Sequence, residues 1–241
     1  MTDDGPILLI GGTRGTGLLI SRLLVERGFP VRVLARNPAD AVVRVPAAAE
    51  IVRGDITQPS TLGPALMGAR HIIFTAGCRS GRPVGPRRIR RIEYEGMSNT
   101  LAAARHTGFA GRFLYMTSSG VGSRSFWTLA LNIYKGNTLT WRERAETLIR
   151  ASGVWYTIIR TGMLTNGAAG RHPIAVTQRP LPLSPRYRIA RADVAAVFVV
   201  AMLHPRAARA TFEIVWQQRA SAPWLECLDR LEPDEPAPPT D

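Results

Sequence analysis

A short apolar run, a glycine-rich turn and an amphipathic stretch follow one another directly at the start of the chain. Ile7–Ile10 is apolar, residues 11–17 read GGTRGTG, and Thr16–Arg27 places leucines on one face at helical spacing. A strand, glycine turn and helix in this order bring unpaired backbone N–H groups to one point, which suits a phosphate. We therefore predict a dinucleotide site rather than a purely structural turn, formed by Gly11, Gly12, Thr13, Arg14, Gly15, Thr16 and Gly17.

The same alternation of apolar runs and helical stretches continues along the chain. Further strands are expected at residues 31–35, 50–53, 71–75, 112–117, 154–159 and 211–215. Further helices are expected at residues 59–67, 92–107, 137–151 and 194–203, the last capped by Asp193. Short apolar strands separated by helices pair in parallel with both sheet faces covered. The predicted fold is therefore α/β, a Rossmann-type doubly wound parallel sheet whose ligands bind at the carboxyl ends of the strands.

Two stretches interrupt this rhythm. Residues 162–190 are rich in Gly, Pro and Arg, and we expect them to form a small C-terminal cap over the substrate. Residues 232–241 are acidic and proline-rich, and we expect a disordered tail. The predicted organisation is a single NAD(P)-binding domain over residues 1–231 that includes the cap.

The net charge of +13 over 241 residues raises the question of a polyanionic partner, and 30 of the 31 basic residues are arginine. We attribute this excess of arginine to codon usage rather than to a surface that binds a polyanion. Six arginines cluster between Arg79 and Arg91 without interleaved aromatic residues for base stacking. A solvated loop and helix start is the favoured interpretation of this cluster, with phosphate contacts as the alternative.

Other classes are excluded by simple features. The longest apolar stretch, Val194–Leu203, is about half the ~20 residues that a membrane-spanning helix needs. Two cysteines are too few for a disulfide framework, and the first residues lack the pattern of a signal peptide. Scattered histidines predict no metal site. We expect a cytoplasmic protein, monomeric or homodimeric, with a small-molecule substrate.

Residues after the next strands indicate which dinucleotide is bound. Arg36 follows the second strand where an acidic residue would indicate NAD, and Arg14 lies in the turn. Two guanidinium groups suit a 2′-phosphate, so NADP(H) is preferred, with NAD(H) as the alternative. Further cofactor contacts are expected from the ends of the third and fourth strands, at Asp55, Ile56, Thr75, Ala76 and Gly77. Turn formation is the alternative role for Asp55 and Gly77.

Several spaced motifs resemble the atypical, NmrA-like branch of the short-chain dehydrogenase/reductase superfamily. The glycine turn is similar to its GGTGxxG, residues 141–166 (WRERAETLIRASGVWYTIIRTGMLTN) to its WKxxAE…LRxSGxxYTIIRPGxL, and ARADVAAV to its sraDVA helix start. The resemblance covers residues 5 to 216 and implies a Rossmann fold that binds NAD(P). Arg14 and Thr161 depart from the usual glycine and proline.

The superfamily's catalytic Tyr-x-x-x-Lys motif is missing. Lys135 is the only lysine, and the residue four positions before it is Leu131. The resemblance aligns the family lysine with Arg142, which can hydrogen-bond a ribose but cannot relay a proton. The candidate catalytic residues are therefore Tyr134 as proton donor, Ser118 to polarise a carbonyl, and Arg142. A packed aromatic is the alternative role for Tyr134.

Four functions remain open. The first is an NADPH-dependent oxidoreductase acting on a small or polyketide-like carbonyl. The second is a non-catalytic NADP(H) redox sensor, which the missing motif favours. The third is a redox-neutral enzyme on the same fold, and the fourth is nucleic-acid binding through the arginine cluster. We prefer the first, because most of the cofactor-binding pattern is present.

Overall fold

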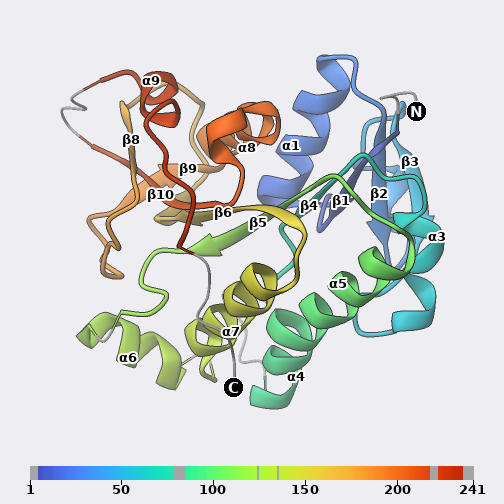
Figure 1. Ribbon diagram of the computed structural model, residues 1–241, viewed down its shortest axis with the longest axis horizontal. Coiled ribbons are helices and arrows are strands. Elements are labelled where there is room, and N and C mark those ends of the chain that lie inside the picture. The colour runs from blue at the N-terminus through green and yellow to red at the C-terminus, as the bar shows by residue number, and fades with distance from the viewer. Residues whose placement is uncertain (1–4, 79–84, 124, 135, 218–221, 236–241) are drawn as a thin grey trace.

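A single mixed sheet of eight strands forms the centre of the computed structural model, which describes residues 5–78, 85–123, 125–134, 136–217 and 222–235 (Figure 1). The strand order is β3-β2-β1-β4-β5-β6-β10-β8. All neighbours pair in parallel except β8, which is antiparallel to β10. The strands are β1 (Ile7–Ile10), β2 (Val31–Ala35), β3 (Glu50–Arg53), β4 (His71–Phe74), β5 (Arg112–Ser118), β6 (Trp155–Thr161), β8 (Ile174–Thr177) and β10 (Ala210–Trp216).

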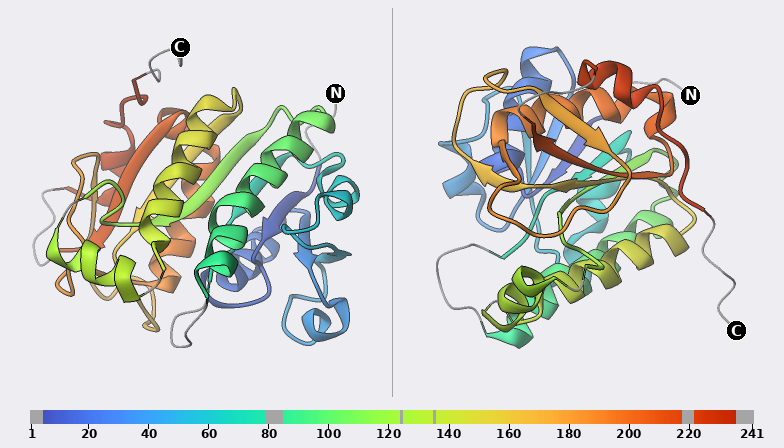
Figure 2. Two further views of the ribbon diagram at one scale, coloured as in Figure 1. Left: turned by 90° about the horizontal axis from the view of Figure 1, so that it is seen from below. Right: turned by 90° about the vertical axis from the view of Figure 1, so that its left-hand side faces the viewer.

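Helices cover both faces of this sheet (Figure 2). On one face lie α1 (Gly15–Glu26), α2 (Pro38–Val42), α8 (Arg191–Leu203) and α9 (Trp224–Leu228). On the other lie α3 (Gly63–Leu66), α5 (Gly96–His106) and α7 (Thr138–Ala151). Short 3₁₀ turns occupy Pro59–Thr61 and Pro205–Ala207. The predicted doubly wound α/β fold is therefore confirmed.

The first strand shows why the sheet needs two layers of helices. Its four side chains are all buried, and they point alternately to opposite faces. Ile7 and Leu9 join the hydrophobic core beneath α1 and α8, whereas Leu8 and Ile10 join the core beneath α3, α5 and α7. A strand without a polar face is stable only between two covering layers.

Besides the short helices α2 and α9, two further helical stretches lie outside the helix ranges expected from the sequence. α4 (Pro86–Arg90) runs through a π-helical turn, Arg91–Glu95, into α5, so that one long helical segment precedes β5. α6 (Phe126–Tyr134) precedes α7 and exposes several large apolar side chains. Figure 1 shows α4, α6 and α7 on the same side of the sheet.

The predicted cap for α8 is wrong. Ala190 is the N-cap residue, and Asp193 lies inside the first turn of the helix with only 2% of its surface exposed. Its two carboxylate oxygens accept hydrogen bonds from the Gly170 N–H and the Trp216 Nε1–H, each at 2.7 Å. Asp193 therefore fastens the segment before α8 to β10.

Residues 162–190 contain short strands rather than only loop. β7 (Met163–Thr165) and β9 (Arg188–Ala190) form a separate two-stranded parallel sheet, while β8 joins the main sheet. The tail expected to be disordered from residue 232 is ordered over residues 232–235. Asp234 accepts hydrogen bonds from Tyr156 at 3.0 Å and from the backbone N–H of Thr211 at 2.8 Å.

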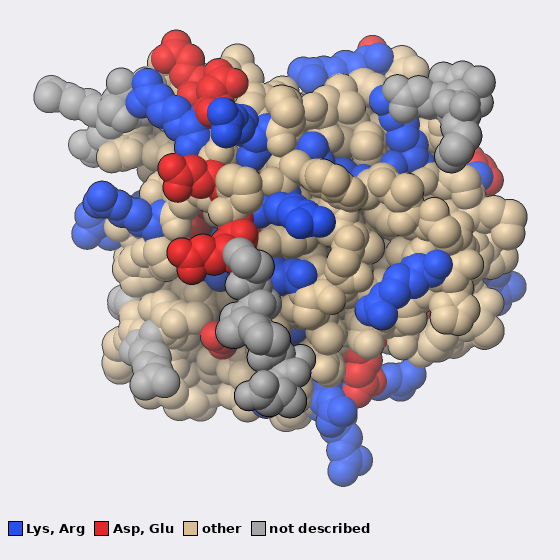
Figure 3. All heavy atoms as spheres, in the orientation of Figure 1, with Lys and Arg blue, Asp and Glu red and all other residues tan. Residues whose placement is uncertain are grey.

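Charged side chains are distributed unevenly over the surface. On the face shown in Figure 3, basic side chains are widely spread, and most acidic ones lie toward the side that carries α9. Among the described residues, no helix is both long and apolar enough to span a membrane.

Candidate functional site

A cleft of about 1770 Å³ lies at the carboxyl ends of the parallel strands. The chain crosses from one side of β1 to the other between β3 and β4, and such a switch point opens a crevice where ligands bind. Residues from the ends of β1, β2, β4, β5 and β6 line the cleft. So do all the predicted site residues except Gly12, namely Gly11, Thr13, Arg14, Gly15, Thr16, Gly17, Arg36, Asp55, Ile56, Thr75, Ala76, Gly77, Ser118, Tyr134 and Arg142.

The glycine turn is packed too closely for side chains at two positions. Gly11 has φ +94°, and a Cβ there would lie 2.7 Å from the Ala76 nitrogen. A Cβ on Gly17 would lie 2.3 Å from the Gly11 carbonyl oxygen. Because both obstacles are backbone atoms, only glycine fits, and the first turn of α1 can approach the end of β4.

Gly12 does not line the cleft and corrects one expectation. A Cβ on Gly12 would lie 2.8 Å from the Leu9 Cβ and 3.1 Å from Val33 Cγ1. Its role in this structure is to let the turn pack onto the hydrophobic core. Gly15, in contrast, has φ +54° and lines the cleft. Among the described residues, a Cβ added to Gly15 would meet only the Arg191 Nε within 4 Å, at 3.8 Å.

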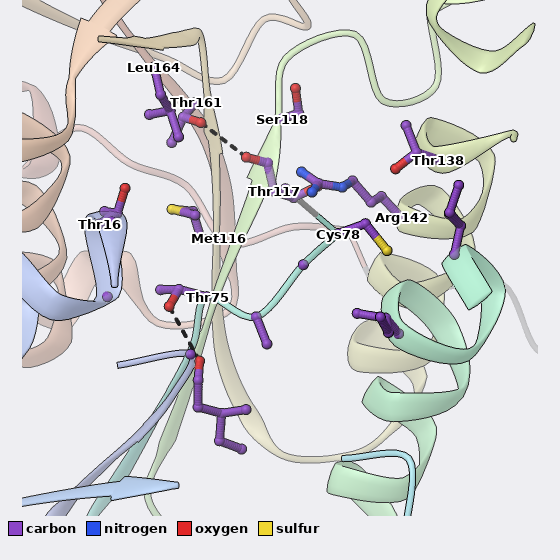
Figure 4. Close-up of a pocket in the computed structure, with 18 of the residues that line it drawn as sticks. Thr16, Thr75, Cys78, Met116, Thr117, Ser118, Thr138, Arg142, Thr161 and Leu164 are labelled. Carbon is purple, nitrogen blue, oxygen red and sulfur yellow. Dashed lines mark hydrogen bonds between the residues drawn. The ribbon is translucent and has the colours of Figure 1, made fainter. Parts of the chain in front are cut away.

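Thr16 provides a structural test of whether the turn fits a phosphate. Its side chain is 4% exposed, and within the described part of the chain its Oγ1 has no hydrogen-bond partner. Figure 4 shows Thr16 at the start of α1, across the cleft from Thr138 and Arg142. A buried hydroxyl without a partner is costly, so a ligand oxygen at this helix N-terminus would stabilise it. The residues present fit a dinucleotide pyrophosphate.

The residues expected to select the cofactor lie in the turn and at the ends of the neighbouring strands. Arg14 and Arg36 both line the cleft, next to the ends of β1 and β2. Asp55 follows β3, and its Oδ1 accepts hydrogen bonds from the N–H and the hydroxyl of Thr57, each at 2.9 Å. Asp55 therefore does form a turn, as its alternative role required, and it also lines the cleft.

Arg142 does not stand alone in the cleft. Its Nε and Nη2 donate to the two carboxylate oxygens of Glu93, at 3.1 and 3.3 Å. Glu93 is 2% exposed, and its Oε1 also accepts the backbone N–H of Cys78 at 2.9 Å. One carboxylate therefore fixes both the arginine on α7 and the backbone that follows β4.

The charge environment keeps Arg142 protonated. Burial alone would lower the pKa of Arg142, but the Glu93 carboxylate, together with Tyr115 and Cys78, raises that pKa above its ordinary value. Arg142 therefore holds and orients a ligand, and it cannot act as a proton donor near neutral pH.

Glu93 is the site residue that the sequence did not reveal. It lies in the π-helical turn Arg91–Glu95, where one residue too many for an α-helical turn changes the direction of the side chains. Nothing in its neighbours marks that turn. A useful signal would have been an acidic residue in a segment otherwise dense in arginine.

A second buried ion pair holds α7 to the sheet. Arg160 on β6 donates to the two carboxylate oxygens of Glu146 at 3.1 and 2.7 Å, and Glu146 is fully buried. Burial lowers the pKa of Arg160, but the hydrogen bonds and charge of Glu146, together with the charges of Glu213 and Asp234, raise it, so the net shift is upward. Glu146 lies one helical turn after Arg142, so this pair fixes the height of Arg142 above the sheet.

Tyr134, the candidate proton donor, and Ser118, expected to polarise a carbonyl, both lie at the cleft. Tyr134 ends α6 and is 73% exposed, so it is not the packed aromatic of the alternative interpretation. Ser118 ends β5, and its hydroxyl donates to the Ser119 carbonyl at 3.1 Å. In the described residues no hydrogen bond joins Tyr134 to Arg142, whose guanidinium contacts Glu93 instead.

Comparison with known proteins indicates the same kind of ligand as the residues of the cleft. A model of NAD(P)H-binding proteins matches residues 11–205. The chain belongs to this NAD(P)H-binding family. This membership agrees with the resemblance of the motifs to the atypical short-chain dehydrogenase/reductase superfamily.

Two curated relatives show the range of the family. Sanguinarine reductase of Eschscholzia californica is 32% identical over 232 residues, which cover 81% of this chain and 83% of that protein. A photosystem II assembly factor of Cyanophora paradoxa is 30% identical over 170 residues, or 70% of this chain. The match spans about half of that assembly factor, 49% of its length.

Solved structures share the fold. An oxidoreductase of Lactococcus lactis superposes with a TM-score of 0.75 at 20% identity, covering 94% of this chain and 96% of that one. Anaerobilin reductase of Escherichia coli O157:H7 gives 0.73 at 23%, covering 90% and 100%. A short-chain dehydrogenase/reductase of Veillonella parvula in complex with NADP gives 0.68 at 14%, covering 90% and 99%.

Proposed function

We propose that this protein is an NADPH-dependent oxidoreductase that reduces a small carbonyl compound. The observation that carries the proposal is the continuous cleft from the glycine turn to the ends of α6 and α7. One end offers the first turn of α1, where the Thr16 hydroxyl has no partner among the described residues, and the other offers Tyr134 and Ser118. Two relatives named as reductases support the same reaction class.

Each part of the cleft has a role in this proposal. The glycine turn binds the pyrophosphate, Arg14 and Arg36 bind the 2′-phosphate, and Asp55 with Ile56 contacts the adenosine. Residues Thr75–Gly77 and Arg142 hold the ribose beside the nicotinamide. Bound NADPH supplies the hydride that reduces the carbonyl carbon.

The proton must come from this chain or from water. Tyr134 is the proposed donor to the carbonyl oxygen, because its phenol lies at the cleft while Arg142 is held protonated by Glu93. Ser118 polarises the carbonyl from the end of β5. Met163 and Leu164 of β7 and the loop residues 183–185 line one wall, and we propose that residues 162–190 form the substrate cap.

Turnover tests this function. NADPH consumption is followed by nicotinamide absorbance over a panel of aldehydes and ketones, for the wild type, Tyr134→Phe and the control Tyr187→Phe. General-acid catalysis typically contributes at least about 100-fold, so Tyr134→Phe should lower kcat by about that factor with unchanged NADPH affinity. No NADPH consumption by the wild type, or equal rates for the two variants, would contradict the proposal.

A non-catalytic NADP(H) sensor is the second candidate. It is favoured by the Glu93–Arg142 pair, because the position aligned with the family lysine is occupied by a guanidinium that does not release a proton near neutral pH. Tight NADPH binding with no consumption across the whole panel would support the sensor over the enzyme.

A further inference from the structure

Three arginines of the predicted surface cluster form part of the cleft wall. Arg87, Arg88 and Arg91 line the cleft from α4 and the π-helical turn that follows it. Their spacing places them on one side of this helical segment. Arg90 faces elsewhere, since it pairs with Glu95 at 3.0 Å and lies over the Trp141 ring. The solvated-loop interpretation is therefore incomplete for residues 85–91, and Arg79 and Arg82 lie outside the described residues.

No acidic group balances these three charges within the described part of the chain. Seven of the described residues that line the cleft are arginines, and Asp55 is the only acid among them. Asp55 follows β3 and is engaged by Thr57, and the charge of Arg142 is compensated by Glu93. No ion pair joins Arg87, Arg88 or Arg91 to another described residue. This wall of the cleft is therefore positively charged and open to an anion.

The position of this wall separates it from the cofactor phosphates. α4 packs against α7, and Gly136, between α6 and α7, lies close to Pro86 and Ile89. The glycine turn and α1 lie with α8 on the opposite face of the sheet. The three arginines thus neighbour Tyr134 rather than the turn proposed to bind pyrophosphate.

We propose that Arg87, Arg88 and Arg91 determine specificity for an anionic substrate, an apolar carbonyl compound that bears a carboxylate. Apolar side chains of Leu131, Met163 and Leu183 line the same cleft and suit the hydrocarbon part. Guanidinium groups bind a carboxylate through paired hydrogen bonds. This inference rests on the proposed function, and it predicts that cationic substrates are rejected.

Ligand binding tests the inference without turnover. Calorimetry measures the affinities of 2-naphthoate and its neutral analogue 2-naphthamide for the protein saturated with NADP⁺. We expect naphthoate to bind at least about tenfold more tightly, because only the carboxylate makes charge-assisted hydrogen bonds. This preference should weaken as salt is raised, because the arginines are exposed.

The variant Arg87→Gln/Arg88→Gln/Arg91→Gln should lose this preference. Three matched replacements outside the cleft, Arg22→Gln/Arg27→Gln/Arg105→Gln, remove the same charge and should retain it. Both variants should keep wild-type NADPH affinity and thermal stability. The single variants Arg87→Gln and Arg88→Gln should each reduce the preference, which keeps the test valid if the triple variant unfolds.

Two results would overturn the inference. One is equal affinity of the wild type for naphthoate and naphthamide, and the other is an unchanged preference for naphthoate in the variant Arg87→Gln/Arg88→Gln/Arg91→Gln. A third result would be that the wild type binds a single-stranded oligonucleotide more tightly than naphthoate and that the same variant loses this binding. It would also overturn the inference, because the arginines would then bind a polyanion. Failure of NADPH to bind the wild type would instead refute the proposed function, since that titration is made separately.

Discussion

The carboxylate of Glu93 and the guanidinium of Arg142 form a two-point ion pair in which the Glu93 side chain is 1% exposed. Removing one partner of a buried pair leaves an uncompensated charge, which typically costs about 3–5 kcal/mol. We expect Glu93→Ala to lower the free energy of unfolding by about 3 kcal/mol, measured by urea denaturation.

The neighbouring Glu143 provides the control, because it is exposed on the same helix as Arg142. Glu143→Ala should change the stability by less than about 0.5 kcal/mol. If both substitutions lower the free energy of unfolding equally, the buried Glu93–Arg142 pair does not contribute more to stability than an exposed glutamate. 

The glycine turn leads to a second prediction. Gly17→Ala places a Cβ 2.3 Å from the Gly11 carbonyl oxygen, so the turn must shift. We expect at least about a hundredfold weaker NADPH binding by calorimetry, because the backbone N–H groups lose their alignment. Gly63→Ala, where a Cβ meets nothing within 4 Å, should leave the affinity unchanged. If Gly17→Ala binds NADPH with wild-type affinity, the proposal that this turn binds the pyrophosphate is wrong.

Cofactor preference gives the third prediction. Arg36 lines the cleft just after β2, where a 2′-phosphate is proposed to lie. Arg36→Glu should weaken NADPH binding by at least about tenfold and leave NADH binding unchanged or stronger, because it replaces attraction to the phosphate with repulsion. Arg27→Glu, on the exposed end of α1, is the charge-matched control. A parallel loss of NADPH affinity in both variants would indicate a general field effect.

The pH dependence of stability gives the fourth prediction. Burial raises the pKa of Glu213, and its contacts with Ser119, Leu181 and Arg160 only partly oppose this. A raised pKa in the folded state means that Glu213 contributes most stability below about pH 4, its unfolded value. That contribution is lost as pH rises through the folded pKa.

Glu213→Gln cannot ionise, and its side-chain oxygen can still accept the Leu181 N–H. The stability gained by this variant relative to the wild type should therefore increase from pH 4 to pH 7, measured by thermal denaturation. Glu226→Gln, exposed on α9, should follow the wild type. A difference between Glu213→Gln and wild type that stays constant with pH would contradict the raised pKa.

Most of the sheet could be predicted because its strands are short apolar runs between clear breaks. β1, β2 and β3 have the predicted bounds, and the other predicted strands differ by one or two residues at their ends. β7 and β9 were missed because three residues of mixed polarity carry no period, and β8 was missed because it is a short run within the segment expected to form the cap. The expected disorder is wrong for residues 232–235, because Asp234 hydrogen-bonds Tyr156 and Thr211, which composition does not reveal.

The site divides in the same way. Local sequence predicted the glycine turn, because strand, turn and helix are contiguous. Glu93 was not predicted, and Arg87, Arg88 and Arg91 were noted only as part of a charged cluster, because their positions at the cleft depend on a π-helical turn and on the packing of α4 against α7. Asp193 was misread as a cap because its partners, Gly170 and Trp216, lie 23 positions away on either side. The cytoplasmic location and the oligomeric state stay predictions.

The most direct test of the central claim is a thermal-shift titration with NADPH, NADH and buffer alone. A ligand at about 100 times its Kd stabilises a protein by about 2.7 kcal/mol, which corresponds to about 5–10 °C for a chain of this size. We predict a rise of that order with NADPH, a smaller one with NADH at equal concentration, and none with NADPH for Gly17→Ala. No rise with either nucleotide for the wild type would contradict the account.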